Sequence, residues 1–374
     1  MVYFSSYWES SILLRKFDFI VLGAGLIGKQ IAIKIKTKYP KSRIALVDRS
    51  PISYGASTRN AGFACFGSVS EIIDDFKRSP QSEVAELAAK RFNGIVKLVE
   101  DFGADNIGYR NTGSYEIYTD KIEYNDALNH FETINQMLSD VAGIDTAFRW
   151  QNVQSMKMKC LPDALFNPYE GMLNSGMLNE VVNEKAHQLG IIPLYGLNIK
   201  HIQKIQNAYQ ISDENGMTLT CDQLIIATNA FTTELMPELD IVPARGQIVL
   251  TKPLDHLPFD GIFHSDKGYI YFRNLDGRIL LGGARNHFEE QEETHDFNGL
   301  DNVQQYLINY LSEVILPGRN FEIESAWSGI MAMGKEKVPI VKRMDDHLLV
   351  CVRMSGMGVA LGPVLSDEIL SLIS

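Results

Sequence analysis

The sequence predicts an α/β fold in which a Rossmann-type dinucleotide-binding domain is interleaved with an α+β domain built on a large antiparallel sheet. Two observations support this prediction. Glycine-rich strand, turn and helix patterns occur near both ends of the chain, at residues 17–48 and 347–374. Residues 242–285 instead form successive short apolar runs separated by turns, which is typical of antiparallel strands. With 374 residues the chain is long enough for two domains.

The stretch from Phe17 to Asp48 contains the more complete of the two glycine patterns. An apolar run predicts a strand, and a segment with helical apolar spacing follows the turn. In such a G-x-G-x-x-G turn the glycines allow a tight bend, close approach of a pyrophosphate, and packing of helix on strand. The phosphates then lie at the helix N-terminus. The turn residues are Gly23, Ala24, Gly25, Leu26, Ile27 and Gly28.

A second apolar run ends in Asp48, which is followed by Arg49. Asp48 comes about 20 residues after the last glycine of the motif, where an acid accepts hydrogen bonds from the hydroxyls of a ribose. An acid here also repels a 2′-phosphate. The motif and its context together predict dinucleotide binding, and the alternative is a tight strand-to-helix corner that binds nothing.

Residues 50–71 show no regular period and are rich in small side chains. A loop of this length is either functional or disordered. Small residues let the backbone come close to a flat ligand, and polar ones supply hydrogen bonds. The alternative, a mobile surface loop, fits less well because the loop also carries Phe63, Cys65 and Phe66. The candidate ligand-binding residues are Ser57, Thr58, Arg59, Asn60, Ala61 and Gly62.

The rest of the chain supplies further elements. Helical spacing of apolar residues predicts helices from Glu83 to Gly103, at 126–141, 173–190 and 303–316. Alternation predicts strands at 107–119, 191–194, 199–205 and 208–211, and the runs within 242–285. The apolar strand 223–227 ends in small and hydroxyl residues, including Ala227 and Thr228, as the floor of a nucleotide site does. The apolar stripes of the helices are typical of core packing.

Composition limits the partners and the compartment. The net charge is −11 and no basic run or stripe is present, so nucleic acid is not an expected partner. No uncharged run reaches the roughly 18 residues of a membrane span, and Glu9 interrupts the apolar stretch that a signal peptide requires. We therefore expect residues 1–17 to form an arm packed ahead of the first strand of a cytoplasmic protein.

Cysteine and histidine spacing indicates neither disulfides nor a metal. The cysteines lack a C-x-x-C pair, as in proteins of a reducing compartment. The eight histidines show no H-E-x-x-H or comparable ligand pattern. The cysteines are Cys65, Cys160, Cys221 and Cys351.

Six short motifs in chain order are similar to those of a known family. They are GAGLIG with the later VDR, GASTRNAG at 55–62, ATNA at 227–230, PARGQ at 243–247, GRILLGGAR at 277–285, and SGMGVALGP at 355–363. Together they resemble the FAD-dependent amine and amino-acid oxidoreductases of the D-amino-acid oxidase superfamily, those of the glycine oxidase and sarcosine oxidase type. The resemblance covers nearly the whole chain. It implies an FAD-binding domain at 1–78, 161–240 and 320–374, and a substrate domain at 79–160 and 241–319.

The resemblance also implies where FAD binds. The adenosine lies on the turn that ends at Asp48, with backbone near Ile199 at the adenine. The loop from Ser57 to Gly62 lies near the pyrophosphate and isoalloxazine. The flavin's pyrimidine edge lies on Gly356, Met357, Gly358 and Val359. Sarcosine oxidase-like members attach flavin through a cysteine in the segment that here reads SGIMAMGKEKVPIV, which has none. We therefore expect noncovalent FAD.

Three residues are candidates for the chemistry. Tyr271 lies on the antiparallel sheet that the resemblance places over the flavin, where its hydroxyl could orient a carboxylate or an amine. Arg285 matches a basic residue over the flavin in sarcosine oxidase-like members. Arg353 stands three residues before Gly356, the position aligned with an arginine that binds the substrate carboxylate in glycine oxidase-like members. The alternatives are a half-buried strand aromatic for Tyr271 and a solvated hairpin end for Arg285.

The expected function is oxidation of the C–N bond of a small amine or amino acid by hydride transfer to FAD, with oxygen or an electron carrier as acceptor. An FAD-dependent 2-hydroxy-acid or polyol dehydrogenase is the alternative within the same fold. An NAD-dependent dehydrogenase would explain the first 50 residues equally well, but it needs neither the C-terminal glycine turn nor the loop at 55–66. A flavin-binding protein without turnover is the remaining alternative, because fold alone does not decide function.

Overall fold

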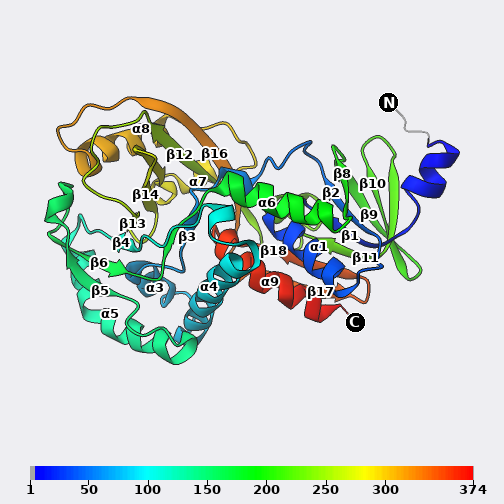
Figure 1. Ribbon diagram of the computed structural model, residues 1–374, viewed down its shortest axis with the longest axis horizontal. Coiled ribbons are helices and arrows are strands. Elements are labelled where there is room, and N and C mark those ends of the chain that lie inside the picture. The colour runs from blue at the N-terminus through cyan, green and yellow to red at the C-terminus, as the bar shows by residue number, and fades with distance from the viewer. Residues whose placement is uncertain (1–4, 374) are drawn as a thin grey trace. The chain divides into compact units, whose positions relative to one another are not determined.

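The computed structural model describes residues 5–373, which divide into two compact units (Figure 1). The first unit comprises the chain up to Thr58, Gly176–Pro243, and the chain from Met331 on. The second comprises Arg59–Ser175 and Ala244–Ile330. The first crossing between units comes at Thr58, earlier than the predicted boundary at 78, because Arg59 and the helices that follow pack within the second unit.

The first unit is built on a mixed sheet with strand order β17-β18-β11-β1-β2-β8. Its parallel strands are β1 (Phe17–Leu22), β2 (Ile44–Asp48), β8 (Ile192–Tyr195), β11 (Thr218–Ile226) and β18 (Leu348–Val352). β17 (Ile340–Asp345) pairs antiparallel with β18, and the hairpin of β9 (Ile199–Ile205) and β10 (Ala208–Asp213) joins β11. The helices are α1 (Leu26–Lys38), α6 (Ser175–Gln188) and α9 (Gly358–Leu372), with a 3-10 segment, η4 (Asn229–Glu234).

Burial explains why the central strands are parallel. β1 and β2 are apolar over nearly their whole length and, apart from Asp18 and Asp48, their residues are buried. Strands buried on both faces are continuous apolar runs, since helices cover a parallel sheet on both sides. α1 and α9 pack against each other within this unit. The buried centre of the sheet holds the ends of β1, β2 and β11 in fixed positions.

The second unit is built on a sheet with strand order β16-β12-β15-β14-β13-β4-β6-β5. The strands are β4 (Ser114–Glu116), β5 (Arg149–Asn152), β6 (Asp163–Asn167), β12 (Val242–Thr251), β13 (Ile262–Ser265), β14 (Ile270–Leu275), β15 (Arg278–Gly283) and β16 (Ile323–Met333). β13 pairs parallel with β4, and the pairs β12–β15, β13–β14, β14–β15, β4–β6 and β5–β6 are antiparallel. The two sheets confirm the predicted fold class.

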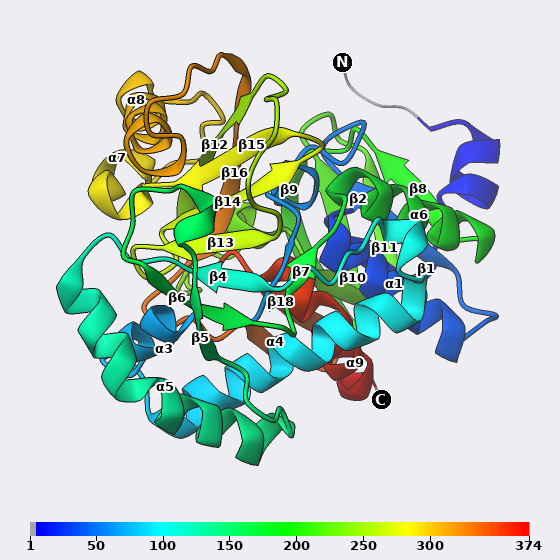
Figure 2. The same cartoon turned by 60° about the vertical axis from the view of Figure 1, so that its left-hand side comes forward.

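One face of the second sheet packs on a large apolar core. Alternate residues of β14, such as Ile270 and Phe272, point into it, and α8 (Asp301–Tyr310) contributes Val303 and Leu307. α4 (Gln81–Phe102) and α5 (Lys121–Ala142) run beside one another in the same unit (Figure 2). The smaller elements are α2 (Ala56–Arg59), β3 (Phe63–Ala64), α3 (Val69–Asp75), β7 (Gly171–Met172), α7 (Glu289–Glu292), the 3-10 turns η2 (Asp105–Ile107), η3 (Gln154–Met156) and η5 (Arg285–His287), and the π-helical turn η6 (Leu311–Ile315).

Three sequence predictions of local structure were wrong. The strand predicted at 107–119 is only β4, because Gly108 and Gly113 take left-handed conformations with φ of 59° and 71°. The helix predicted at 303–316 gives way to a π-helical turn after Tyr310. The loop predicted at 50–71 contains α2, β3 and the start of α3.

The N-terminal arm also differs from the prediction. Residues 1–4 lie outside the described residues. The π-helical turn η1 (Glu9–Leu13) buries none of its residues, and Tyr7 and Trp8 are 72% and 70% exposed. Within the described residues, the side chains of Tyr7, Trp8, Ile12 and Leu13 are therefore exposed instead of packing on the first strand.

The cysteines are free thiols, and three of the four are buried. In the part of the chain that the structure describes, no helix is both long enough and apolar enough to span a bilayer. Among the same residues no cluster of histidine, cysteine and carboxylate side chains is arranged to hold a metal ion.

Candidate functional site

The glycine turn lies where the carboxyl ends of three parallel strands meet. β1 runs between β2 and β11, so the chain order reverses there. The N–H of Gly23 donates to Val47 O at 2.7 Å, and the N–H of Ala227 donates to Leu22 O at 2.7 Å. In open α/β sheets ligands bind outside the carboxyl ends of the strands at such a reversal. The turn is therefore in the position of a dinucleotide site.

Space around the glycines explains why larger residues are excluded. Gly23 has a φ of 107°, and a Cβ there would lie 2.4 Å from Ala227 O. A Cβ on Gly28 would lie 1.9 Å from Gly23 O, which no rearrangement of side chains could relieve. These two glycines therefore allow the bend and the close packing of α1 on β1, as the motif predicted.

Asp48 connects the turn to the loop that follows β2. One carboxylate oxygen accepts from the N–H of Ala24 at 2.7 Å, and the other accepts from the N–H of Ser50 at 2.9 Å. Its backbone oxygen accepts from the N–H of Leu197 at 3.0 Å. Burial, with the charge of Asp48 adding to it, raises the pKa of the neighbouring Tyr195 phenol. Asp48 is thus fixed by backbone groups at the end of β2.

The loop after Asp48 returns to the first turn of α1. The N–H of Leu26 donates to Ser57 Oγ at 2.8 Å, and the side chain of Asn179 donates to Ser57 O at 2.8 Å. Ser57 therefore lies directly at the N-terminus of α1. Arg49 points elsewhere, since its guanidinium stacks 3.6 Å from the ring centre of Phe231 and lies 3.4 Å from Glu234.

The second glycine turn follows β18 and leads into α9. Because β18 is parallel to β11, its carboxyl end lies at the same edge of the sheet as the first turn. Ser355 and Gly356 have φ of 48° and 83°. A Cβ on Gly356 would lie 3.3 Å from Met331 Sδ. The position aligned with a carboxylate-binding arginine thus faces a thioether.

Arg353 is committed to contacts within the first unit. It is 5% exposed, and its Nε and Nη2 donate to Val338 O at 3.1 and 2.9 Å. Its Nη1 donates to Asp240 O at 3.0 Å and to the Asp240 carboxylate at 2.6 Å. These contacts indicate that Arg353 stabilises the fold of the first unit. That Arg353 binds substrate stays a prediction, and its contacts do not favour it.

The other residues predicted near the nucleotide lie in the same unit. Ile199 is the first residue of β9 and is buried. Thr228 follows β11, and its hydroxyl lies 2.8 Å from that of Thr232. Met357 precedes α9, whose first residues are Gly358 and Val359.

The segment from Arg59 to Gly62 belongs to the second unit. Arg59 donates to Ser328 O, and its own carbonyl accepts from the indole of Trp327 at 3.0 Å. Asn60 Oδ1 accepts from the N–H of Gly62 at 2.9 Å. The carbonyl of Gly62 accepts from Arg273 at 2.8 Å. The GASTRNAG motif is thus divided between the two units at Thr58.

Tyr271 lies on the face of the second sheet opposite its large core. A Cβ on Gly282 would lie 2.5 Å from the tyrosine ring, so the ring covers this glycine of the neighbouring strand. Its edge also meets Phe63, with ring centres 5.7 Å apart. Burial raises the pKa of Tyr271 to about 12. The phenol is therefore a neutral hydrogen-bond donor at physiological pH, and no hydrogen bond found among the described residues uses its hydroxyl.

Arg285 follows the strand that carries Gly282. Its side chain is 12% exposed and lies 3.3 Å from Glu289. The guanidinium is 5.9 Å from the centre of the Tyr269 ring. The structure thus places Tyr271 and Arg285 in one unit, on adjacent strands or just beyond, and Arg353 in the other.

Sequence reasoning missed a buried pair beside Tyr271. His264 is 6% exposed, pairs with Tyr271 across strands β13 and β14, and also meets Phe63, with ring centres 5.5 Å apart. Its Nε2 lies 3.7 Å from Glu170, which also accepts from the N–H of Phe66 at 2.7 Å. Burial is the largest single effect and lowers the pKa of His264, but the carboxylates of Glu170, Glu71 and Glu116 together outweigh it, so the pKa is raised. The sequence feature that could have indicated the burial of His264 is its position in the predicted strand GIFHS, directly after Phe263, which is buried.

Comparison with known proteins identifies the family. A family model described as FAD dependent oxidoreductase matches residues 18–372. The chain belongs to this family.

Curated relatives are distant and longer. The bifunctional protein ThiO/ThiG of Synechocystis is 21% identical over 366 residues, which cover 95% of this chain and 51% of that protein. A mitochondrial L-2-hydroxyglutarate dehydrogenase of Caenorhabditis briggsae is 24% identical over 260 residues, 66% of this chain and 56% of that protein. The chain spans about half the length of these two curated relatives.

Solved structures share the fold. Glycine oxidase from Geobacillus kaustophilus superposes with a TM-score of 0.78 at 18% identity, covering 96% of this chain and 94% of that one. L-proline dehydrogenase from P. horikoshii superposes with a TM-score of 0.76 at 16% identity, again covering 96% and 94%. At these identities the likeness concerns the fold.

The residues of the first unit fit FAD. Gly23 and Gly28 leave room for no side chain, Asp48 is fixed at the end of β2, and the N-terminus of α1 points from the same edge of the sheet. Backbone N–H groups and an acid at these positions are the groups that hold a diphosphate and a ribose. The family and the geometry therefore agree on the cofactor.

Proposed function

We propose that this protein oxidises the C–N bond of a small amine or amino acid and transfers the hydride to noncovalently bound FAD. The observation that carries the proposal is the likeness to glycine oxidase over 96% of the chain, together with the match to the FAD-dependent family. L-proline dehydrogenase, another enzyme named for an amino acid, adds support. Noncovalent binding is supported by the lack of cysteine at residues 328–341.

In this proposal the first unit is the FAD-binding domain. FAD, when bound, supplies the hydride acceptor. The turn from Gly23 to Gly28 and the N-terminus of α1 receive its diphosphate, and Asp48 receives a ribose. The turn from Gly356 to Val359 takes the pyrimidine edge, and Ile199 lies near the adenine.

The second unit supplies the groups that hold the substrate. The neutral phenol of Tyr271 donates a hydrogen bond to a carboxylate or an amine. Arg285 provides positive charge for a substrate carboxylate or for reduced oxygen. Hydride transfer needs no nucleophilic side chain, so orientation and charge are what the protein must provide.

Oxidation of a C–O bond is the second candidate. The relative named L-2-hydroxyglutarate dehydrogenase favours it, because a 2-hydroxy acid offers the same hydride from the carbon that bears the heteroatom. A carboxylate on the substrate would engage Arg285 in either case. The two candidates therefore differ in the substrate and share the site.

Anaerobic reduction distinguishes the two candidates. The purified yellow protein is mixed without oxygen with a panel of small amines, amino acids and 2-hydroxy acids, and the flavin absorbance near 450 nm is followed. Bleaching by an amine or amino acid supports the proposal, and bleaching by hydroxy acids alone establishes the second candidate. A protein that binds FAD but is bleached by neither class would contradict both.

Two further readouts complete the test. Acid denaturation should release the yellow cofactor into the supernatant, whereas a yellow pellet would mean a covalent bond. Admitting oxygen to the reduced protein identifies the acceptor, because rapid reoxidation indicates an oxidase and slow reoxidation indicates an electron carrier.

A further inference from the structure

Lys29 is a fully buried lysine in the first turns of α1. Its exposed fraction is 0%, and it directly follows Gly28 of the glycine turn. Lysine is almost never fully buried unless its ammonium is paired. The position is also unfavourable for a cation, because the N-terminal end of a helix carries partial positive charge. The burial of Lys29 therefore calls for an anion.

The protein itself offers few groups that could stabilise the buried positive charge of Lys29. Lys29 Nζ donates to Ser53 Oγ at 2.6 Å. No ion pair within 4.0 Å joins it to a carboxylate among residues 5–373. An ammonium has three donors, so one hydroxyl leaves two of them without a protein acceptor. An incompletely paired buried charge is costly, and another group must offset that cost.

Ser53 links Lys29 to the glycine turn. The N–H of Lys29 donates to Gly25 O at 3.1 Å, so the residue lies one helical turn from Gly25. Ser53 Oγ lies 3.5 Å from Ala24 O. Lys29 and Ser53 therefore support from within the protein the backbone that receives the diphosphate in the proposed function.

Few other charges reach this ammonium. Asp48 at the end of β2 raises the pKa of Lys29, but burial is the larger effect and lowers it to about 8. Arg49 on the following loop points to Phe231 and Glu234 instead. Tyr54 on that loop is 48% exposed, and Tyr195 on β8 has a raised pKa and stays neutral. Asp48 is thus the charge that acts on Lys29, and it is already bound by two backbone N–H groups.

We propose that Lys29 is a buried counter-cation for the diphosphate of FAD, held by Ser53 behind the glycine turn, and that its charge sets the affinity for the cofactor. This inference rests on the proposed binding of FAD. The glycine motif contributes backbone donors, whereas Lys29 contributes a full positive charge that no part of the motif specifies.

The inference predicts the direction of a pH effect. A dianionic diphosphate favours the charged ammonium, so binding must raise the pKa of Lys29 above its value of about 8 in the cofactor-free protein. FAD affinity is then full below pH 8 and falls as the pH rises above it, by about tenfold between pH 7 and pH 9. Binding at pH 9 takes up about one proton, and binding at pH 6.5 takes up nearly none.

The first experiment compares FAD dissociation constants of wild type, Lys29→Met and Lys38→Met at pH 7 and pH 9. Lys38 is an exposed lysine in the last turn of the same helix and serves as the control. Lys29→Met should bind FAD at least about tenfold more weakly at pH 7 and should lose the pH dependence, while Lys38→Met should match wild type. Equal affinity and an equal pH profile in Lys29→Met would overturn the inference.

Calorimetry on the wild type keeps the inference testable if Lys29→Met fails to fold. Titration of FAD in two buffers of different ionisation enthalpy measures the protons taken up. Uptake at pH 9 that disappears at pH 6.5 supports the inference, and equal uptake at both values would overturn it. Wild type that does not bind FAD at pH 7 would contradict the proposed function, whereas pH-independent FAD binding would contradict only the role of Lys29.

The dissociation constants of fragments of the cofactor, each measured by direct titration of the FAD-free protein, locate the effect. ADP carries the diphosphate and adenosine does not. The dissociation constant of ADP should rise from pH 7 to pH 9 in wild type and stay constant in Lys29→Met, and that of adenosine should be the same in both proteins at both pH values. If the Lys29→Met substitution weakened adenosine as much as ADP, the ammonium would not be acting on the diphosphate.

Discussion

Two regions are built by different means: the edge of the first sheet at Gly23, Gly28 and Asp48, where we propose that FAD binds (the cofactor edge), and the face of the second sheet that carries Tyr271 and His264 (the Tyr271 face). At the cofactor edge, the backbone determines the geometry. Gly23 and Gly28 allow close approach of backbone atoms, and the carboxylate of Asp48 accepts hydrogen bonds from backbone N–H groups. At the Tyr271 face, side chains from distant segments determine the surroundings, as in the pair of His264 and Glu170. A site that is made from the backbone of one short segment can be predicted from the sequence. A site whose side chains come together only after folding cannot be predicted in this way.

Gly28→Ala should have the largest effect and tests whether the cofactor edge depends on backbone space. The new Cβ would lie 1.9 Å from Gly23 O, so we expect a loss of stability of about 3 kcal/mol or more and a protein without flavin. Gly55→Ala is the control, because a Cβ there meets no atom within 4 Å. The flavin-to-protein ratio and the melting temperature are the measurements. A stable, yellow Gly28→Ala protein would show that the turn tolerates a side chain.

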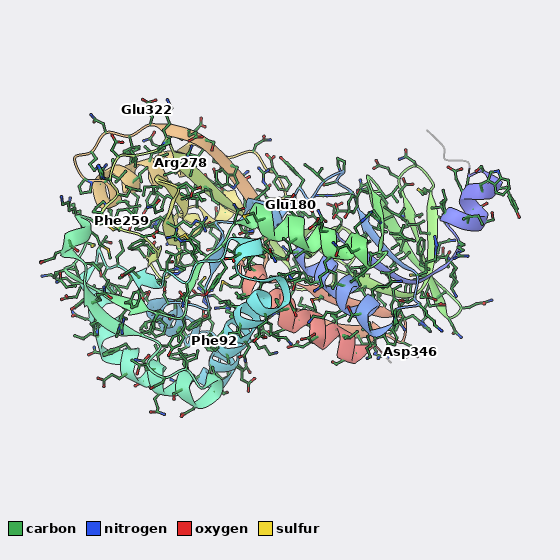
Figure 3. All side chains as sticks on the ribbon, viewed as in Figure 1. Phe92, Glu180, Phe259, Arg278, Glu322 and Asp346 are labelled. Carbon is green, nitrogen blue, oxygen red and sulfur yellow. The ribbon has the colours of Figure 1, made fainter. Side chains whose placement is uncertain are left out.

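Glu170→Ala tests the side-chain network of the second unit. It leaves the N–H groups of Phe66 and Gly67 without their acceptor and removes the carboxylate that lies 3.7 Å from His264 Nε2, and we expect a loss of about 3–5 kcal/mol in the free energy of unfolding. Glu180→Ala, on the exposed face of α6, should change it by less than about 0.5 kcal/mol (Figure 3). Urea unfolding measures both.

The same network predicts a pH dependence. Because Glu170 raises the folded-state pKa of His264, the pair contributes stability that is fully present below the unfolded pKa of histidine and is lost as the pH rises through the folded value. The stability difference between wild type and Glu170→Gln should therefore shrink from pH 6 to pH 9. A constant difference would mean that His264 is neutral throughout.

Asp48→Ala should weaken FAD by an intermediate amount. Loss of a charge-assisted hydrogen bond worth roughly 1.5–3 kcal/mol lowers affinity by about one to two orders of magnitude. Asp48→Asn keeps the side-chain shape and one acceptor, so it should lie between the alanine variant and wild type. Fluorescence titration of the cofactor-free protein gives the dissociation constants. Unchanged affinity in Asp48→Ala would place the ribose elsewhere.

Arg285→Ala should have the smallest effect and tests the Tyr271 face without disturbing the fold. We expect FAD to be retained and turnover to fall about tenfold, or about 1.4 kcal/mol, through either the reductive or the oxidative half-reaction. Arg278→Ala is the matched control, since Arg278 (Figure 3) begins β15, the strand that Arg285 follows, and pairs with Glu324 at 2.6 Å. Rapid-mixing measurements separate the half-reactions, and changes below about threefold in both would remove Arg285 from the site.

Sequence alone predicted the parts of the molecule that depend on neighbouring residues. The strand, turn and helix around Gly23, the acid at the end of β2, and the hairpin of β14 and β15 follow from local patterns. The contacts of Arg353 do not, because its acceptor Asp240 is 113 residues away. His264 was overlooked for the same reason, since Glu170 lies on a distant segment.

Lys29 was overlooked for another reason. A lysine in a helix is normally solvated, and neither its spacing nor its neighbours in sequence mark it as buried. Its burial depends on the loop that brings Ser53 back over α1. The length of that loop was visible in the sequence, but its path was not.

Because the first unit is built from three separate segments of the chain, its sheet cannot be completed as soon as its first strands are synthesised. β1 and α1 are synthesised first, but β18 and α9, which complete their sheet and pack on α1, come from the last segment of the described chain. A nascent chain can therefore pair β1 with β2 early, while one side of α1 stays uncovered until α9 has been synthesised. The sheet of the first unit therefore cannot be completed before β18 has been synthesised, and a truncation that removes β18 and α9 should destabilise this unit more than the number of lost residues suggests.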